Sequence, residues 1–483
     1  MDWRSFQVVL SRYLEFCSPM LAPFRRFSGF QWGMLGIFLF SLFLRFWNLS
    51  QFNTLVFDEV YYAKFANDYL IGTPFFQSHP PLSQYLIAFG IWLGSHLPAS
   101  PDTVNNLTGS MRSTFSYRWL NALTGSFLPL IVGAIAYQLT DRRNYALIAA
   151  ALVALDGLFL VESRYALNNI YLISFGLLGQ LFFLLALKKP QVQFRLLIIA
   201  GVFFGCCASI KWNGLAFLLG IYLILALYNL KKIPFPPQLS LFISRLTRPE
   251  KILNHCQNIN LFQFFVALLL VPLLIYSLLW IPHLIVNPEY NFWEVHREIY
   301  LFHRRIGGNS PTVHRYCSPW YSWLIMWRPV AYFYETAQTN QGKVIYDVHA
   351  MGNPILWWMS FLAILIVLIL FGLQIFNKKT DNFYPSEMII YLAFNYMANL
   401  LPWMEISRCT FLYHYMGSYL FTILALAWLI NQWLNSQLIL EKTTGVVTLV
   451  LIIVAFIHWS PIYLGIPLSD LGFKIRLLFP NWI

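Results

Sequence analysis

Two adjacent carboxylates, Asp58 and Glu59, follow the first long apolar run of the chain, and a His79-Pro80-Pro81 turn begins twenty-one residues after Asp58. A carboxylate can take a proton from an attacking hydroxyl group, and a Pro pair holds a neighbouring His in a rigid turn. Because adjacent side chains rarely point the same way, we expect distinct roles. We assign Asp58 as a base, whereas Glu59 would orient a loop or bind a sugar or a cation.

The other candidate residues are ionisable side chains inside or at the ends of apolar runs. Such a residue costs several kcal/mol in a membrane unless it is paired or lines an aqueous cavity. Asp156 lies within the third run, and the others lie at the predicted outer ends of the third, fifth and ninth runs: Glu162, Arg164, Lys211, Glu405 and Arg408. Carboxylates facing Arg164, Lys211 and Arg408 would form a base beside an anion site. For each cation taken alone, the alternative is a side chain that snorkels to the membrane surface.

This combination suits group transfer from a phosphate held in the membrane. Cations stabilise a departing phosphate, while a carboxylate takes the proton of the attacking hydroxyl. If the phosphate leaves a sugar carbon, one carboxylate suffices, because a phosphodiester leaving group is a weak base. Direct displacement would then invert the anomeric centre.

The composition requires a membrane protein. The chain has 483 residues, of which 58% are hydrophobic and only 11% charged, whereas soluble domains are roughly a quarter charged. The net charge of +12 does not indicate nucleic-acid binding, since the basic residues form short clusters between apolar runs. Positive charge on cytoplasmic loops explains this pattern better.

Eleven apolar runs are long enough to cross a bilayer, which takes about 17–25 residues. They centre near Phe38, Leu128, Ala154, Gly176, Phe203, Leu219, Leu273, Ile364, Phe394, Ile423 and Ile453. With a cytoplasmic N-terminus, the inner loops carry Arg142-Arg143, Lys188-Lys189, Arg195, Lys231-Lys232, Lys251, Lys378-Lys379 and Lys442. This bias favours an inner N-terminus and an outer C-terminus. We expect the first helix to be a retained signal anchor after Arg4, Arg12, Arg25 and Arg26, and residues 82–97 to form an interfacial helix.

The predicted fold is therefore an all-α polytopic membrane domain spanning residues 1–483. Two long outer loops, residues 49–117 and 286–353, hold most of the mass outside the membrane, and residues 354–483 form a C-terminal four-helix part. The second loop is rich in Trp, His and Arg, including Trp320, and suits either an aromatic belt or a site for sugar or peptide. The six cysteines lack metal-ligand spacing and are interpreted as packing residues.

Several motifs resemble the protein O-mannosyltransferases, polytopic enzymes of the GT-C glycosyltransferase superfamily. In chain order they are Phe57-Asp58-Glu59 with Lys64-Phe65-Ala66, His79-Pro80-Pro81-Leu82, Glu162-Ser163-Arg164, Ser209-Ile210-Lys211-Trp212-Asn213-Gly214, Tyr332-Phe333-Tyr334, Gly352-Asn353-Pro354 and Arg408 with Tyr413-His414-Tyr415. The resemblance covers nearly the whole chain.

The resemblance implies a GT-C fold of about eleven spans, a polyprenyl-phosphate-linked mannose donor, and transfer to Ser or Thr of secreted or membrane proteins without a metal or other cofactor. Asp58 then matches the catalytic acidic position, Glu59 its neighbour, and Arg164 an arginine associated with the donor phosphate. His79 and Pro80 match the acceptor-loop motif. Lys211 and Arg408 are assigned to the phosphate from charge and topology, and Trp320 and His414 to the acceptor or sugar. A short central loop without the MIR domain of eukaryotic members points to a bacterial plasma membrane.

Three alternatives stay open. The family usually has an Asp shortly after the Ser-Arg pair, where this chain has Asn168-Asn169, so the sugar could differ. Related GT-C enzymes move aminoarabinose or other lipid-linked sugars to a lipid or glycan. A transporter would also need many spans, but it would show an internal repeat and polar sites near the midplane. A lipid-linked polymerase or a flippase-like scaffold would leave the carboxylate pair unexplained.

Overall fold

The computed structural model describes residues 27–98, 100, 103–230, 232–236, 252–310, 312–339, 342–376 and 386–482. Some residues that carried the predicted orientation lie outside this part of the chain: Arg4, Arg12, Arg25, Arg26, Lys231, Lys251, Lys378 and Lys379. The predicted signal anchor and cytoplasmic N-terminus therefore stay predictions.

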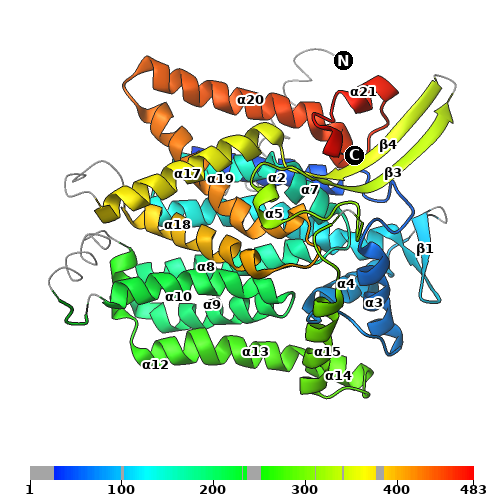
Figure 1. The fold of residues 1–483 in the computed structure, drawn as a ribbon, viewed down its shortest axis with the longest axis horizontal. Coiled ribbons are helices and arrows are strands. Elements are labelled where there is room, and N and C mark those ends of the chain that lie inside the picture. The colour runs from blue at the N-terminus through cyan, green and yellow to red at the C-terminus, as the bar shows by residue number, and fades with distance from the viewer. Residues whose placement is uncertain are drawn as a thin grey trace, which may run out of the picture.

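Long helices lie side by side and form the body of the molecule (Figure 1). In the described part of the chain, nine segments are long and apolar enough to cross a bilayer. They are α2 (Gly29–Phe46), α5 (Thr114–Thr140), α8 (Asn169–Lys188), α9 (Gln193–Ala208), α10 (Leu215–Leu230), the continuous segment α12 (Leu261–Gln263), α13 (Val271–Leu279) and α14 (Ile281–Val286), α17 (Pro354–Phe376), α19 (Met416–Asn435) and α20 (Ile439–Leu464).

The two remaining predicted spans are also helical. One is the pair α6 (Arg143–Ala154) and α7 (Gly157–Arg164), which together are long and apolar enough to cross a bilayer. The two helices meet at an angle of 59° at the break between them. The other is α18 (Ser386–Leu400), which has 15 residues. All eleven predicted centres thus fall on helices, which confirms the helical membrane fold.

Asp156 explains the bend between α6 and α7. Its carboxylate caps α7 by accepting from Phe159 N at 3.0 Å, and it also accepts from Asn353 N at 3.1 Å and from Tyr419 Oη at 2.8 Å. The next residue is Gly157, whose missing side chain makes room for the ring of Tyr463. Asp156 is therefore satisfied by protein groups and has a structural role.

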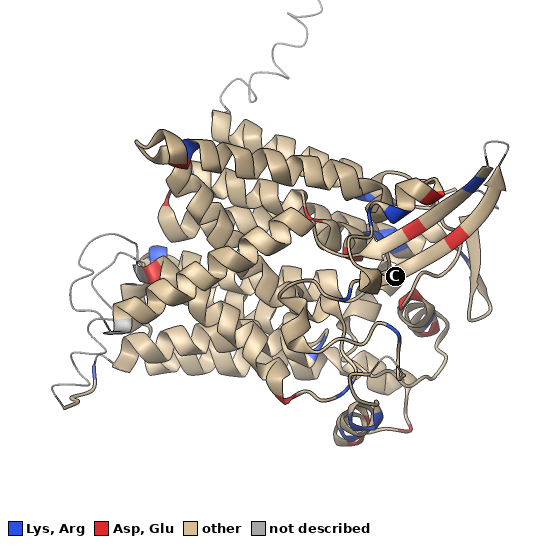
Figure 2. Ribbon diagram, turned by 45° about the horizontal axis from the view of Figure 1, so that its top comes forward, with Lys and Arg blue, Asp and Glu red and all other residues tan. Residues whose placement is uncertain are grey.

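The charged residues lie mostly at the two ends of the helical body, and the ribbon between these ends carries few of them (Figure 2). Such a distribution suits a bilayer, because a helix satisfies its own backbone groups and only apolar side chains then face the lipid.

The two long loops fold at one end of the body (Figure 1). The first contains α3 (Glu59–Ile71), α4 (Leu82–Gly94) and the hairpin β1 (Val104–Leu107) and β2 (Ser110–Ser113). The second contains α15 (Phe292–Arg305), α16 (Trp320–Trp323) and the antiparallel hairpin β3 (Val330–Thr339) and β4 (Gly342–Ala350), and α21 (Asp470–Lys474) follows the last long helix. The hairpins add strands to a fold predicted as all-α. Helix α4 has 13 residues, too few to cross a bilayer, as expected.

A disulfide corrects the prediction that the cysteines only pack. Cys317 in the second outer loop is bonded to Cys409 in the connection between α18 and α19. The prediction was wrong for this pair because a separation of 92 residues carries no recognisable spacing. Cys206, Cys207 and Cys256 are free, whereas Cys17 lies outside the described residues.

Candidate active site

Two adjoining cavities of about 910 and 420 Å³ lie where the two outer loops meet the helical body. They share seven lining residues: Ser78, His79, Lys211, His303, Ile306, Arg408 and His414. The larger cavity continues along the apolar face of α10, whereas the smaller one contains Asp58 and a ring of aromatic side chains. The structure therefore brings five of the predicted residues together: Asp58, His79, Lys211, Arg408 and His414.

Asp58 precedes α3 and faces the smaller cavity. It occupies the N-cap position, yet its side chain makes no capping hydrogen bond. The carboxylate is thus not needed to start the helix. Burial raises its pKa to about 6, and the positive charge of Lys211 opposes this rise. A carboxyl group with this pKa can accept a proton near neutral pH.

Phe57 sets the direction in which Asp58 points. It has a φ of 52°, a left-handed conformation that non-glycine residues seldom adopt and that costs on the order of 1–3 kcal/mol. Its ring stacks on Tyr332 with centroids 4.3 Å apart and planes 9° from parallel. The Tyr332 hydroxyl donates in turn to Glu162 Oε1. The stacked pair holds the unusual turn immediately before Asp58.

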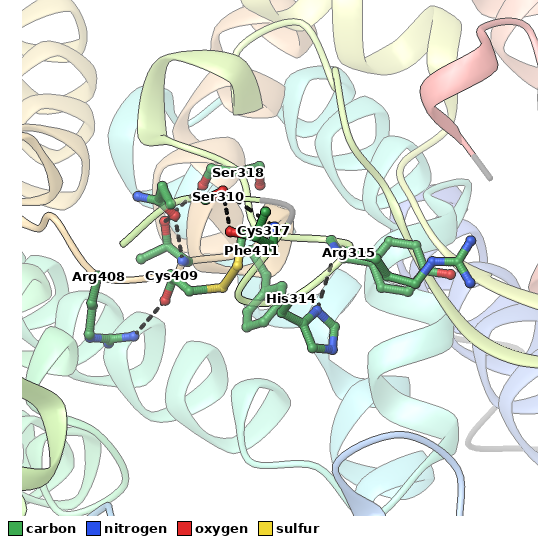
Figure 3. Close-up of a disulfide and its surroundings, with 12 residues drawn as sticks. Ser310, His314, Arg315, Cys317, Ser318, Arg408, Cys409 and Phe411 are labelled. Carbon is green, nitrogen blue, oxygen red and sulfur yellow. Dashed lines mark hydrogen bonds between the residues drawn. A yellow bond between two sulfur atoms is a disulfide. The ribbon is translucent and has the colours of Figure 1, made fainter. Parts of the chain in front are cut away.

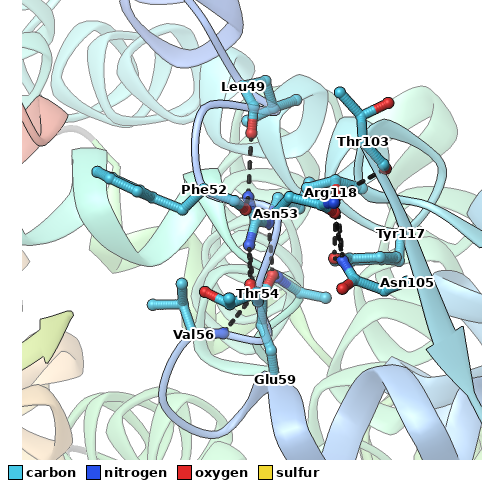
Figure 4. Close-up of polar contacts among 12 residues, drawn as sticks. Leu49, Phe52, Asn53, Thr54, Val56, Glu59, Thr103, Asn105, Tyr117 and Arg118 are labelled. Atoms are coloured by element: carbon cyan, nitrogen blue, oxygen red, sulfur yellow. Dashed lines mark hydrogen bonds and ion pairs between the residues drawn. The ribbon is translucent and has the colours of Figure 1, made fainter. Parts of the chain in front are cut away.

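Glu59 lines neither cavity and is completely buried among the polar groups drawn in Figure 4. Arg118 of α5 donates to both of its oxygens, at 2.8 Å from Nε and 2.7 Å from Nη2. The backbone N–H groups of Val56 and Ala166 each donate to it at 2.8 Å. Glu59 was predicted either to orient a loop or to bind a sugar or a cation. These contacts fit the first role, because they fix the segment that precedes α3.

Arg118 completes this support and was missed by the sequence analysis. It also donates to the carbonyl groups of Leu49, Phe52 and Thr54, which lie in the segment that leads to Asp58 (Figure 4). The signal available was an Arg at the outer end of a long apolar run, since such a residue must find partners inside the protein.

Lys211 lines the same cavity as Asp58, and its ammonium group is positioned by a hydrogen bond to Asn169. Its Nζ donates to Asn169 Oδ1 at 2.9 Å, and Asn169 Nδ2 donates to Glu162 Oε2 at 3.1 Å. The ammonium also lies 5.5 Å from the ring centroid of Tyr413. Burial lowers the pKa of Lys211 to about 8, against the opposing effect of the Asp58 and Glu162 carboxylates.

Arg408 supplies the second cation and lines both cavities. One of its nitrogens, Nη1, donates to the carbonyl of Cys409 at 3.0 Å (Figure 3). Burial lowers its pKa, but an arginine retains its charge at physiological pH. Two positive groups therefore face the region where the cavities join.

Three histidines, His79, His303 and His414, line the same two cavities as these cations. The rings of His79 and His303 lie 5.2 Å apart, and His303 Nε2 donates to the Ser78 carbonyl at 2.9 Å. Burial and the nearby positive charges hold the pKa of His79 well below its ordinary value and lower that of His303 to about 4. These rings are neutral near pH 7 and offer hydrogen bonds without adding charge. Within the described residues, no group of three His, Cys, Asp or Glu side chains could hold a metal ion.

Other predicted residues lie elsewhere. Arg164 Nη1 donates to the carbonyls of Leu44, Arg45 and Trp47 at 2.8, 3.2 and 2.7 Å, where it satisfies the end of α2. It lines neither cavity, so the geometry does not support a phosphate contact. Trp320 begins α16 and also lines neither cavity, whereas Pro80 and Glu405 line the larger one.

Comparison with known proteins gives matches over almost the whole chain. Residues 36–286 match the family described as dolichyl-phosphate-mannose-protein mannosyltransferase, and residues 288–482 match the C-terminal four-transmembrane region of protein-O-mannosyltransferase. A polyprenol-phosphate-mannose–protein mannosyltransferase of Corynebacterium glutamicum is 22% identical, with 96% of this chain and 95% of the relative covered. The protein of the same name from Mycolicibacterium smegmatis is 24% identical at the same coverage.

Two solved structures share the fold. The Pmt1-Pmt2 protein O-mannosyltransferase complex of S. cerevisiae, bound to the sugar donor, has a TM-score of 0.77 at 14% identity, with 95% of this chain and 93% of that chain covered. ArnT from Cupriavidus metallidurans in the apo state has a TM-score of 0.54 at 12% identity, with 89% and 64% covered. The first family match alone spans more than half of the sequence, and the chain belongs to the protein O-mannosyltransferase family.

Proposed function

We propose that the chain transfers mannose from a polyprenyl-phosphate-linked donor to Ser or Thr hydroxyl groups of secreted or membrane proteins, with inversion at the anomeric carbon. The observation that carries this proposal is the placement of Asp58, which makes no capping bond and shares a cavity with Lys211 and Arg408. The names of the bacterial relatives support the donor and the acceptor class.

The larger cavity suits the lipid donor. Its α10 wall is formed by apolar and aromatic side chains: Leu215, Ala216, Leu218, Leu219 and Tyr222. This wall leads to Lys211 and Arg408, so a prenyl chain can lie along α10 while its phosphate contacts the two cations. Apolar walls with a few converging polar groups are typical of ligand sites.

The smaller cavity suits the sugar and the acceptor hydroxyl. The oxygen of the acceptor hydroxyl forms a bond to the anomeric carbon while Asp58 takes the proton of that hydroxyl. The bond from that carbon to the phosphate oxygen breaks, and the electron pair leaves with polyprenyl phosphate. The phosphate gains one negative charge in this step, which Lys211 and Arg408 stabilise in a site shielded from water.

The disulfide supports an outer location for this site. Disulfides persist in oxidising compartments such as the bacterial periplasm and cell surface and are rare in the cytosol. Cys409 directly follows Arg408, which lines both cavities, so the catalytic end of the molecule would face outward. Together with the bacterial relatives, this favours a plasma membrane with the site on its outer face.

The test is a transfer assay on purified protein with radiolabelled polyprenyl-phosphate-mannose and a Ser/Thr-rich peptide. We expect label on the peptide with the wild type and none with Asp58→Asn, whose donor binding and melting temperature stay unchanged. Asp68→Asn is the matched control, because Asp68 lies on the same helix but lines neither cavity.

Two outcomes would count against the proposal. Transfer by Asp58→Asn at the wild-type rate would remove Asp58 as the base. No transfer by a folded wild type would argue against mannose or against a protein acceptor, and other lipid-linked sugars would then be supplied to the same preparation.

A further inference from the structure

We propose that the Cys317–Cys409 disulfide is a positioning link for the donor-phosphate site, because it holds Arg408 where the two cavities join. This inference rests on the proposed function for the role of Arg408 as a phosphate contact. It adds that the affinity for the phosphate depends on the oxidised state of two cysteines that lie outside both cavities.

Arg408 comes from a segment without helical support. It lies between two short 3-10 turns, Leu401–Glu405 and Leu412–Tyr415, in the connection from α18 to α19. A residue in such a connection cannot rely on helix hydrogen bonds to fix its position. Its placement must come from what the segment contacts.

In the described part of the chain, the hydrogen bonds from residues 408–410 to other segments go to the second outer loop. Arg408 pairs with Gly308 in an isolated antiparallel bridge, and Cys409 N donates to the Gly307 carbonyl at 2.7 Å. On the following residue, Thr410 N donates to Asn309 Oδ1 at 2.8 Å. The segment that carries Arg408 is thus paired with residues 307–309, which lie outside the helices and strands of the second outer loop.

The covalent bond secures this pairing (Figure 3). The Cα atoms of Cys317 and Cys409 are 5.1 Å apart, and the bond closes a loop of 92 residues. The other contacts between the two segments are non-covalent: a few loop hydrogen bonds and ring contacts such as that of His314 with Phe411, whose centroids lie 5.1 Å apart. A cross-link over a long loop removes more conformational freedom from the unfolded chain than a cross-link over a short loop.

The geometry also connects the bond to the guanidinium group. Arg408 precedes Cys409 and donates to its carbonyl at 3.0 Å, so a shift of Cys409 displaces the charged group directly. Lys211 is anchored separately through Asn169. Loss of the disulfide should therefore weaken phosphate binding through one cation and leave the other in place.

The experiment measures direct binding of polyprenyl phosphate and of the uncharged polyprenol to the full-length protein in detergent. Wild type is compared before and after reduction with a phosphine, and with the double variant Cys317→Ser/Cys409→Ser. We expect the affinity for polyprenyl phosphate to fall about tenfold, the loss of one hydrogen bond to a charged group, with little change for polyprenol. A purely structural role would weaken both ligands equally and would overturn the proposal.

Two controls make the outcome specific. In the Arg408→Ala background, removal of the disulfide should have no further effect on phosphate binding, whereas additive losses would contradict a role through Arg408. The variant Cys206→Ser/Cys256→Ser should keep the full response to reduction. If the double variant does not fold, reduction of folded wild type still decides the question, and unchanged phosphate affinity after reduction would refute the link.

The binding assay also separates this inference from the proposed function. It needs no turnover, so an enzyme that proves inactive with mannose can still show a disulfide-dependent phosphate site. Conversely, an enzyme with normal mannose transfer and a redox-independent phosphate affinity would refute only the positioning role.

Discussion

Lys211 Nζ donates a hydrogen bond to Asn169 Oδ1, and this bond fixes the ammonium group on the side of the cavity that Asp58 faces. Asn169 can do this because its amide nitrogen is held by Glu162. The carboxamide thus points its oxygen at the cation and its nitrogen at the carboxylate.

Replacement of Asn169 should separate geometry from charge. We expect Asn169→Ala to lower kcat/KM for the donor about tenfold, because Lys211 loses its acceptor. Asn169→Asp places a carboxylate beside the ammonium and should raise the pKa of Lys211. Steady-state kinetics with varied donor test the first variant, and the pH profile of the second should extend to higher pH. An Asn169→Ala enzyme with unchanged kcat/KM would show that Lys211 needs no such support.

The pH dependence of kcat/KM should be bell-shaped. Asp58 must be deprotonated to act as a base, so activity is lost as the pH falls through about 6. Lys211 must be charged to stabilise the phosphate, so activity is lost as the pH rises through about 8. Lys211→Arg retains its charge at high pH and should remove the alkaline limb while the acid limb stays. A wild-type profile that is flat between pH 5 and 9 would contradict both assignments.

Loss of the Glu59–Arg118 ion pair should destabilise the fold rather than impair chemistry alone. Both side chains are buried, at 0% and 1% exposure. Removal of one partner leaves a buried charge without compensation and costs about 3–5 kcal/mol. We expect Arg118→Met and Glu59→Gln to lower the melting temperature in detergent clearly, whereas Asp58→Asn leaves it unchanged. Equal melting temperatures for all three variants would contradict the distinction between the two adjacent carboxylates.

A larger side chain on the α10 wall should obstruct the prenyl chain. Ala216 lines the larger cavity, so Ala216→Phe should raise the donor KM severalfold with little change in the peptide KM. The effect should shrink with a donor of shorter prenyl chain. Leu223→Phe is the control, because Leu223 is on the same helix, is 39% exposed and does not line the cavity. If both variants behave alike, the prenyl chain does not lie along this wall.

Much of the architecture was predictable because hydrophobic length determines which segments can cross a membrane. Every predicted span falls on a helix, including the bent pair around Asp156. Asp58, Lys211 and Arg408 were also correctly brought together, since each is an ionisable residue at the same predicted face. The rule that such residues need partners or an aqueous cavity was sufficient for them.

The same rule could not decide which partner each residue finds. Arg164 donates to carbonyl groups at the end of α2 and does not line a cavity. Like Lys211, it is a cation at the predicted outer end of a span. The role of Asn169 and the stacking of Tyr332 on Phe57 depend on contacts between segments far apart in sequence. The disulfide between Cys317 and Cys409 was not predicted for the same reason, since the two residues are 92 positions apart.

The contacts of Glu59 have a consequence for biosynthesis. Glu59 is held by Arg118 and by the backbone of Ala166, so the turn that presents Asp58 cannot be set until α5 and α7 have been made and inserted. Arg408 follows only after α18. A ribosome-bound chain therefore lacks a working site through most of its translation, and the newly made enzyme begins to modify other proteins only once nearly all of its own helices are in the membrane.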